Sequence, residues 1–326
     1  MQEKNIDSPK KSGETPPDIS IVVPLLNEEQ SLGELADQIK KALAKANYNY
    51  EILFIDDGST DRSWEIIEQL AEDRDEIIGI RLRRNYGKSD ALQTGFERSI
   101  GRFVVTMDAD LQDDPNEIPA MIEKLENGAD LVSGWKKKRH DPISKTIPSR
   151  FFNAVTRWVT GIKLHDFNCG LKAYRKEVVE NISLYGEMHR YVPLLAKWEG
   201  FGRIEEQVVQ HHPRKYGNTK FGISRFLNGF LDLVTLLFIN RYVNRPMHFF
   251  GLFGVLFLFV GIAINLYLAY IKIFLGEPLA NRPLLFLGLL LVMVGVQFFS
   301  IGFLGELLNR GDERNQKPNV AEITES

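Results

Sequence analysis

Two long stretches near the C-terminal end of this sequence contain no charged side chain. They run from Met247 to Ile271 and from Pro283 to Leu304, and each exceeds the roughly 20 residues that a helix needs to cross a hydrocarbon core. Because the segment between them, 272–282, is short, the two helices must form a hairpin with both ends on one side of the membrane. We therefore predict a transmembrane hairpin over 246–306, followed by a tail over 307–326.

Charged residues predict the orientation of this hairpin. Three arginines precede the first stretch and three basic residues follow the second, against two in the connecting segment. Since Lys and Arg concentrate on the cytoplasmic side of membrane proteins, we expect the N-terminal part and the tail to be cytoplasmic. The single cysteine, Cys169, suits a reducing compartment and excludes a multi-cysteine zinc site. The net charge of -3 gives no overall basic field, so no nucleic-acid partner is expected.

The N-terminal part alternates between two kinds of segment. Residues 1–17 are polar and Pro-containing, which predicts a disordered lead-in. From residue 18, short apolar runs alternate with amphipathic ones, and the runs are 18–24, 50–56, 77–82, 103–108 and 130–134. Between the first two, the apolar residues Leu32, Leu35, Ile39 and Leu43 recur at helical spacing. We predict an α/β domain over 18–222, with a mostly parallel sheet covered by helices.

Two further segments combine apolar side chains with charged or polar ones. The segment 145–163 places aromatic residues between lysines and arginines, and the apolar segment 221–242 is interrupted by Asn228 and Asp232. Both patterns are typical of amphipathic helices at a membrane surface. The first is equally consistent with an ordinary helix of the folded domain. We expect a region of interfacial helices over 223–245.

The strongest signal for chemistry is an acidic turn that directly follows an apolar run. Asp108 and Asp110 stand at alternate positions, and Gln112 follows. Oxygen ligands at the end of a strand suit Mg²⁺ or Mn²⁺, which can bridge a diphosphate. An EF-hand is excluded because Asp113 and Pro119 replace the required Gly and Glu. A solvated acidic turn that caps the next helix is the alternative.

Two other polar turns precede the acidic turn. In 56–59, which follows the second apolar run, a carboxylate can accept hydrogen bonds from a base or ribose, and a plain turn with a helix cap is equally consistent. The segment 85–89 is similar to the end of a P-loop, but no Gly stands five residues before Gly87. No G-x-G-x-x-G motif is present either. An ATPase or a dehydrogenase is therefore not supported.

Two basic clusters complete the set of candidate sites. The cluster 211–220 contains several cationic side chains and a Gly, so it can close over a diphosphate and neutralise a leaving group. Attraction to anionic lipid is the alternative. The cluster 136–139 is either a solvated charged run or a receptor for a lipid phosphate.

Six motifs together resemble glycosyltransferase family 2, in particular its polyprenyl-phosphate hexosyltransferases such as dolichyl-phosphate mannose synthases and bactoprenol glucosyltransferases. The resemblance covers about residues 19–222. The motifs are 23–28, 56–61, 85–88, 108–112, 166–170 and 214–220. The resemblance implies an A-type nucleotide-sugar fold with a Rossmann-like sheet. The hairpin is similar to that of the bactoprenol glucosyltransferases, which implies a bacterial plasma membrane and a homo-oligomer, often a tetramer.

The resemblance assigns roles to four groups of residues. The nucleotide sugar would contact Pro24, Leu26, Asn27, Glu28, Ile55, Asp57, Asn85, Lys88, Asp108 and Ala109. The metal, Mg²⁺ or Mn²⁺, would be held by Asp108, Asp110 and Gln112. The acceptor phosphate would contact Lys136, Arg139 and Ser149. The catalytic residues would be Asp110, Asp166, Arg214 and Lys220. The family usually has Arg at the first acceptor position, and Lys cannot form the same bidentate contact.

The implied reaction is an inverting transfer of a hexose, preferably from UDP-glucose, to a polyprenyl phosphate. A phosphate monoester has a second pKa of about 6, so the acceptor is already a nucleophile at neutral pH. We expect Asp166 to orient the sugar or the acceptor-binding cations rather than to act as a base. A processive polysaccharide synthase is disfavoured because Ala154 replaces the Gln of its Q-x-x-R-W motif. A catalytically silent nucleotide-sugar-binding scaffold is the alternative from another class.

Overall fold

The structure of the protein is a computed structural model. It describes residues 16–137, 153–158, 160–213, 215–216, 246–276, 278 and 283–312. The chain divides into two compact units, Met1–Phe226 and Leu227–Ser326. Most of the predicted lead-in and the whole predicted interfacial region, 223–245, lie outside the described residues. The two units are considered separately below.

A seven-stranded sheet with the order β3-β2-β1-β4-β6-β5-β7 forms the centre of the first unit. Its strands are β1 (Ile19–Leu25), β2 (Tyr50–Asp56), β3 (Ile77–Arg81), β4 (Phe103–Thr106), β5 (Leu131–Trp135), β6 (Lys172–Arg175) and β7 (Ile204–Val208). Only β6 is antiparallel to its neighbours, β4 and β5. The mostly parallel sheet and its first five strands are confirmed, whereas β6 and β7 are additions that the apolar runs did not predict.

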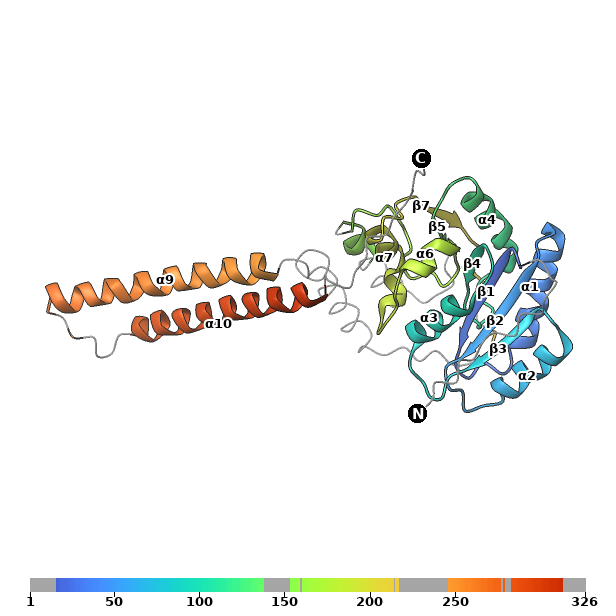
Figure 1. Cartoon of the computed structure of the whole chain (residues 1–326), viewed down its shortest axis with the longest axis horizontal. Coiled ribbons are helices and arrows are strands. Elements are labelled where there is room, and N and C mark those ends of the chain that lie inside the picture. The colour runs from blue at the N-terminus through green and yellow to red at the C-terminus, as the bar shows by residue number, and fades with distance from the viewer. Residues whose placement is uncertain are drawn as a thin grey trace. The chain divides into compact units, whose positions relative to one another are not determined.

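Helices cover both faces of this sheet. On one face, α1 (Leu32–Ala46) packs against α2 (Ser63–Asp73) and α4 (Ile118–Glu126). On the other, α3 (Lys88–Arg98) packs against β1 and against α6 (Lys176–Asn181), so α1 and α3 flank the strands in Figure 1. The apolar side chains predicted to face inward from the first helix are all fully buried. Shorter elements are η1 (Pro115–Glu117), η2 (Met188–Tyr191) and α7 (Val192–Trp198).

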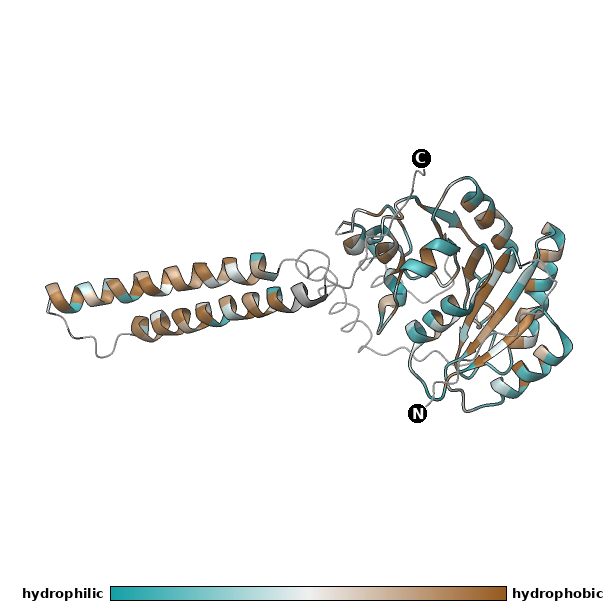
Figure 2. Ribbon diagram, viewed as in Figure 1, coloured by the Kyte–Doolittle hydropathy of each residue, from teal (hydrophilic) through white to brown (hydrophobic). Residues whose placement is uncertain are grey.

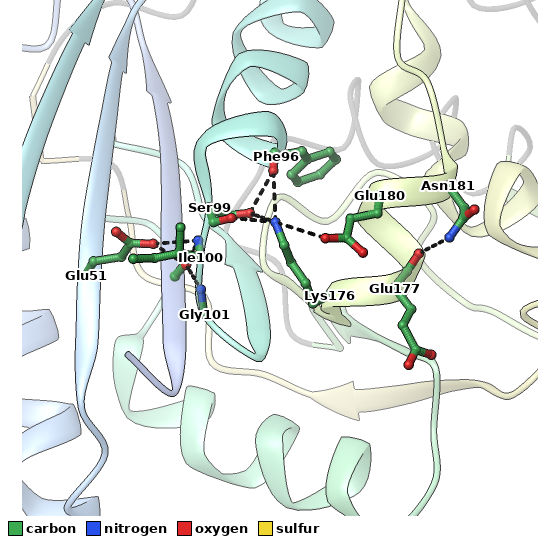
Figure 3. A network of polar contacts seen from close by, with 10 residues as sticks. Glu51, Phe96, Ser99, Ile100, Gly101, Lys176, Glu177, Glu180 and Asn181 are labelled. Carbon is green, nitrogen blue, oxygen red and sulfur yellow. Dashed lines mark hydrogen bonds and ion pairs between the residues drawn. The ribbon is translucent and has the colours of Figure 1, made fainter. Parts of the chain in front are cut away.

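A polar network lies at the end of the sheet where strands β1 and β4 begin (Figure 3). The buried carboxylate of Glu51 accepts a hydrogen bond from the backbone N–H of Ile100 at 3.0 Å. Nearby, the Lys176 ammonium donates to the Ser99 hydroxyl at 3.0 Å and to the Phe96 carbonyl at 3.4 Å. Both acceptors lie at the C-terminal end of α3. The ammonium therefore stabilises carbonyl groups and the negative end of the helix dipole.

Lys176→Met is expected to lower the free energy of unfolding by about 1–3 kcal/mol, because hydrogen bonds from a charged donor to part-buried carbonyls are lost. The measurement is the Tm of the detergent-solubilised chain, which should fall by several degrees. Lys40→Met is the matched control, since Lys40 makes an exposed ion pair with Glu76 at 3.6 Å and such pairs contribute little. Equal Tm values for the two variants would contradict the prediction.

The described part of the second unit forms two long apolar helices, α9 (Pro246–Phe274) and α10 (Pro283–Asp312). Both are long and apolar enough to cross a membrane. Only 17% and 11% of their most apolar stretches are buried, so the helices are not the shielded core of a soluble fold. Figure 2 shows hydrophobic residues around both helices. The predicted pair of long apolar helices is confirmed.

Glycines let the backbones of α9 and α10 approach closely. A Cβ added at Gly254 would lie 2.9 Å from the backbone N of Phe299, and one added at Gly261 would lie 2.8 Å from the carbonyl oxygen of Gly288. A side chain at either glycine would force the helices apart. Small residues at the contact are how apolar helices pack in lipid, where the hydrophobic effect provides no driving force.

Candidate active site

The candidate site lies at the carboxyl ends of the parallel strands. After β1 the chain continues through α1 to β2 on one side, whereas β4 lies on the other side of β1. The strand order therefore reverses between β1 and β4, and such a switch point leaves a crevice outside the strand ends where α/β proteins bind ligands. The loops that follow β1, β2, β3 and β4 all emerge at this edge. They carry most of the residues that the sequence predicts to bind the nucleotide sugar.

Hydrogen bonds connect the loop that follows β1 to the loop that follows β2. Asn27 adopts a left-handed backbone conformation with φ 58°, which Asn tolerates better than most residues. Its side-chain oxygen accepts a hydrogen bond from the Thr60 N–H at 2.8 Å, and its own N–H donates to the Ser59 hydroxyl at 2.9 Å. The Glu28 N–H donates to the Ser63 hydroxyl at 2.9 Å. These contacts fix the edge of the crevice, so Asn27 stabilises its shape.

Two acids at the end of β2, Asp56 and Asp57, also hold neighbouring segments. Asp56 is fully buried and pairs with Arg81 at 3.3 Å. The two carboxylate oxygens of Asp57 accept hydrogen bonds from the N–H groups of Tyr86 at 2.7 Å and Gly87 at 2.9 Å. Asp57 thus positions the segment that ends at Lys88. Both of its oxygens are engaged in this way, which the sequence did not predict.

Lys88 and Asp108 form the central ion pair of the site. Lys88 is the first residue of α3, and its ammonium donates a hydrogen bond to Oδ1 of Asp108, just beyond β4. About a third of each side chain is exposed, so both can reach a ligand. Burial alone would raise the pKa of Asp108, but the ammonium of Lys88, with weaker contributions from Lys136 and Lys172, lowers it to about 2. Asp108 is therefore an anion at every physiological pH.

The segment 166–170 lies directly against Asp108. A Cβ added at Gly170 would lie 2.6 Å from Oδ2 of Asp108, and the Gly170 carbonyl accepts a hydrogen bond from the Thr106 hydroxyl at 2.9 Å. Asp166 is buried, and its Oδ1 accepts a hydrogen bond from the Asn168 N–H at 3.2 Å. The structure thus brings Asp166 into a turn that borders the ion pair.

Gly170→Ala is expected to lower kcat/KM for a nucleotide-sugar donor by about 10-fold or more, because the new methyl group must displace the Asp108 carboxylate and small misplacements in a site are costly. Steady-state kinetics with varied donor concentration measure this effect. Gly33→Ala is the matched control, since a Cβ there meets nothing within 4 Å. Unchanged donor kinetics in Gly170→Ala would show that kcat/KM for the donor does not depend on the observed position of the Asp108 carboxylate.

The acidic turn continues from Asp108 through two further predicted ligands. Leu111 bends the chain with φ 59°, and Oδ1 of Asp110 accepts a hydrogen bond from the Gln112 N–H at 3.2 Å. The Gln112 carbonyl in turn accepts a hydrogen bond from the His212 N–H at 2.9 Å. Gln112 is therefore tied to the start of the predicted closing loop, 211–220. Within the described residues, no three His, Cys, Asp or Glu side chains form a complete metal site.

The residues predicted for the acceptor phosphate and the closing loop are only partly described. Lys136 pairs with Asp113 at 2.6 Å, and only 13% of its side chain is exposed. The other predicted residues lie outside the described part of the chain, and they are Arg139, Ser149, Arg214 and Lys220.

Sequence reasoning missed two residues close to the central ion pair. The His189 N–H donates to the Ser89 hydroxyl at 3.1 Å, and His189 Nδ1 lies 3.1 Å from the same oxygen. Burial, together with Lys88 and another cation nearby, lowers the pKa of His189 to about 2, so the imidazole is neutral. Lys172 is buried and donates to the Cys169 carbonyl, and burial lowers its pKa. No spacing pattern marks His189, because its partner Ser89 lies 100 positions away in the sequence.

The single thiol is not a candidate nucleophile. Burial raises the pKa of Cys169 to about 12, and the thiolate is the reactive form. The chemistry that the site can perform is instead electrostatic. It combines a partly exposed ion pair, an acidic turn and further cations at the carboxyl ends of the parallel strands, a position that suits nucleotides.

Comparison with known proteins identifies the family. Residues 20–183 match the family model Glycosyl transferase family 2. The chain is 39% identical over 302 residues to a dodecaprenyl-phosphate galacturonate synthase from Rhizobium johnstonii, an alignment that covers 90% of this chain and 88% of the relative. It is 36% identical over 295 residues to an undecaprenyl-phosphate 4-deoxy-4-formamido-L-arabinose transferase from Pseudomonas aeruginosa, covering 90% and 85%. The chain belongs to glycosyltransferase family 2 and is a glycosyltransferase.

A solved structure with a similar fold is glucosyl-3-phosphoglycerate synthase from Mycobacterium tuberculosis, in a complex with Mn²⁺ and UDP-glucose. The TM-score is 0.50 at 22% sequence identity, and the match covers 68% of this chain and 78% of that one. The likeness establishes the fold of the first unit as the A-type nucleotide-sugar fold, as predicted from the sequence.

Proposed function

We propose that this enzyme transfers a sugar from a UDP-sugar to a polyprenyl phosphate at the cytoplasmic face of a bacterial plasma membrane. The observation that carries the proposal is the Lys88–Asp108 pair beside the acidic turn, at the strand edge where nucleotides bind. The C-terminal helices α9 and α10 would anchor the chain where its lipid acceptor lies. Both relatives named above are described as acting on a polyprenyl phosphate, which supports this choice of acceptor.

On the donor side, the nucleoside would lie over the ends of β1 and β2. Pro24 and Ile55 are paired residues of these strands, and Leu26, Asn27 and Glu28 follow β1 directly. Because Asn27 and Asp57 use their side chains to hold neighbouring loops, we assign them to shaping the nucleoside pocket. Asn85, Lys88, Asp108 and Ala109 would border the ribose and the diphosphate.

The acidic turn has the donor chemistry that a hard cation requires. Asp108 is ionised and partly exposed, Asp110 follows within the same bent turn, and Gln112 offers an amide oxygen. Mg²⁺ or Mn²⁺ takes such oxygen ligands and keeps further positions for substrate phosphates, so a ligand set without a third carboxylate fits. When bound, the cation would neutralise charge that develops on the departing diphosphate.

On the acceptor side, the lipid phosphate would attack the sugar C1 from the face opposite the nucleotide, which inverts the anomeric centre. With a second pKa of about 6, the phosphate monoester is mostly dianionic at neutral pH and needs no strong base. Asp166 would orient the sugar or the cations that face the acceptor. Arg214 and Lys220 would approach the diphosphate from the closing loop, and Arg139 and Ser149 would receive the lipid phosphate.

The sugar is proposed at the level of a hexose. UDP-glucose is the donor that the resemblance to bactoprenol glucosyltransferases favours. The similarity to a galacturonate synthase adds UDP-galacturonate as the second donor to test. The similarity to a formamido-arabinose transferase adds a UDP-linked formamidopentose, a donor outside the proposed hexose class. Association as a tetramer is a further expectation, which native mass spectrometry in detergent would test.

The experiment for this function measures radiolabelled sugar transfer from each of these UDP-sugars, and from GDP-mannose, to undecaprenyl phosphate in detergent. Reactions are run with Mg²⁺, with Mn²⁺ and with EDTA. Glycolipid that forms only with a metal supports the proposal and identifies the donor. Nucleotide binding without a lipid product from any donor would contradict it and favour a catalytically silent scaffold.

A further inference from the structure

A buried ion pair joins the acidic turn to the end of β5. Asp113, at the end of the acidic turn, has no exposed side-chain surface, and its Oδ1 lies 2.6 Å from the ammonium of Lys136. Lys136 directly follows β5, and only 13% of its side chain is exposed. No other group in the described part of the chain donates a hydrogen bond to the Asp113 carboxylate. The charge of Asp113 is therefore balanced by Lys136.

The backbone of Asp113 holds a third segment. Asp113 forms an isolated antiparallel bridge with His211, and one residue earlier Gln112 exchanges hydrogen bonds with His212 in both directions, at 2.9 Å and 3.4 Å. His211 and His212 are the first two residues of the predicted closing loop, 211–220. A single residue thus connects the proposed metal ligands, the start of that loop and, through its side chain, the end of β5.

The ion pair with Asp113 argues against binding of the acceptor phosphate by Lys136. Although burial alone lowers the pKa of an ammonium group, Asp113 raises the pKa of Lys136, so Lys136 keeps its positive charge beside the Asp113 carboxylate, 2.6 Å away. A cation committed to a buried carboxylate adds little net charge for a phosphate dianion to use. Removing either partner alone would leave the other as an uncompensated buried charge, which is strongly destabilising.

We propose that Asp113 and Lys136 act as a positioning pair, which holds the acidic turn and the start of the closing loop in place for catalysis, and that Lys136 does not itself bind the acceptor phosphate. This inference rests on the proposed function, because it concerns how that reaction is organised. It replaces the role that the family resemblance gave to Lys136, and leaves the phosphate to other cations of the acceptor side.

The test compares Lys136→Gln, Asp113→Asn and the double variant in the full-length chain. The measurements are kcat, the KM for undecaprenyl phosphate, and the Mn²⁺ concentration that gives half-maximal activity. Each single variant should lower kcat about 10-fold or more, since small displacements of catalytic groups are costly, and should raise the half-maximal Mn²⁺ concentration several-fold. The acceptor KM should stay within twofold. The double variant should recover part of kcat, because Asn and Gln form a neutral hydrogen-bonded pair without a buried charge.

The opposite pattern would overturn the proposal. A rise of 10-fold or more in the acceptor KM of Lys136→Gln, with no such rise in Asp113→Asn, would mean that Lys136 binds the phosphate. Unchanged kinetics in both single variants would equally exclude a positioning role. If the single variants fail to fold, the double variant provides the test, because it also lacks the Lys136 ammonium. An acceptor KM within twofold of wild type would support the proposal, and a rise of 10-fold or more would overturn it. Wild-type enzyme without any transfer would instead contradict the proposed function, so the two failures are distinguishable.

Discussion

Asp110→Asn is expected to lower kcat for sugar transfer by about 10²–10³-fold. Asn keeps the size of the side chain and an oxygen that can accept the Gln112 hydrogen bond, so the turn should survive. What disappears is one negative charge on a proposed metal ligand, and removing one element of preorganised electrostatic stabilisation typically costs this much. Single-turnover transfer at saturating donor and acceptor would measure the loss directly.

The matched control for this variant is Asp37→Asn. Asp37 is an exposed acid on α1 that pairs with Arg74 at 2.7 Å, and its replacement should leave kcat within twofold. Raising the Mn²⁺ concentration should recover part of the activity of Asp110→Asn but not change the control. If Asp110→Asn keeps more than about a tenth of the wild-type kcat at limiting metal, Asp110 is not a metal ligand.

The strands that could be predicted are those whose signal is local. β1, β2 and β4 are apolar runs fully buried along almost their whole length, and such runs identify themselves without knowledge of the rest of the fold. β6 could not be found in this way. Its four residues include Lys172 and Arg175, and it becomes a strand because β4 and β5 pair with it from both sides. Tertiary pairing, rather than local preference, decides such a segment.

The candidate site shows the same difference between local sequence signals and contacts that only the fold creates. The acidic turn is contiguous, so Asp108 and Asp110 could be predicted from one short motif. The contact between His189 and Ser89 joins residues 100 positions apart, and only the fold brings them together. Asp57 shows a subtler limit, because its motif predicted hydrogen bonds to a base or ribose, or a plain turn with a helix cap. The structure shows its carboxylate accepting hydrogen bonds from the backbone that presents Lys88.

Lys88→Met is the second variant with a large expected effect, a loss of about 100-fold in kcat/KM for the donor. The methionine side chain is similar in length but has no charge to offer the diphosphate, and it leaves Asp108 without its partner. Lys88→Arg should recover part of the activity, since it restores the positive charge with a different geometry. Lys40→Met, in an exposed ion pair elsewhere, should behave as wild type.

The pH dependence of ligand binding by Lys88→Met reports the protonation state of Asp108. In the wild type, Lys88 lowers the pKa of Asp108 to about 2 against the opposing effect of burial, so the carboxylate is ionised throughout the range in which the protein is handled. Without the ammonium the pKa must rise, and protonation of Asp108 then weakens metal-dependent binding at higher pH than before. Calorimetric titration of UDP with Mn²⁺ between pH 4.5 and 7.5 should show affinity that falls earlier on acidification in Lys88→Met than in wild type. Parallel pH profiles would mean that the ion pair does not control Asp108, and that the loss of activity arises from the diphosphate contact alone.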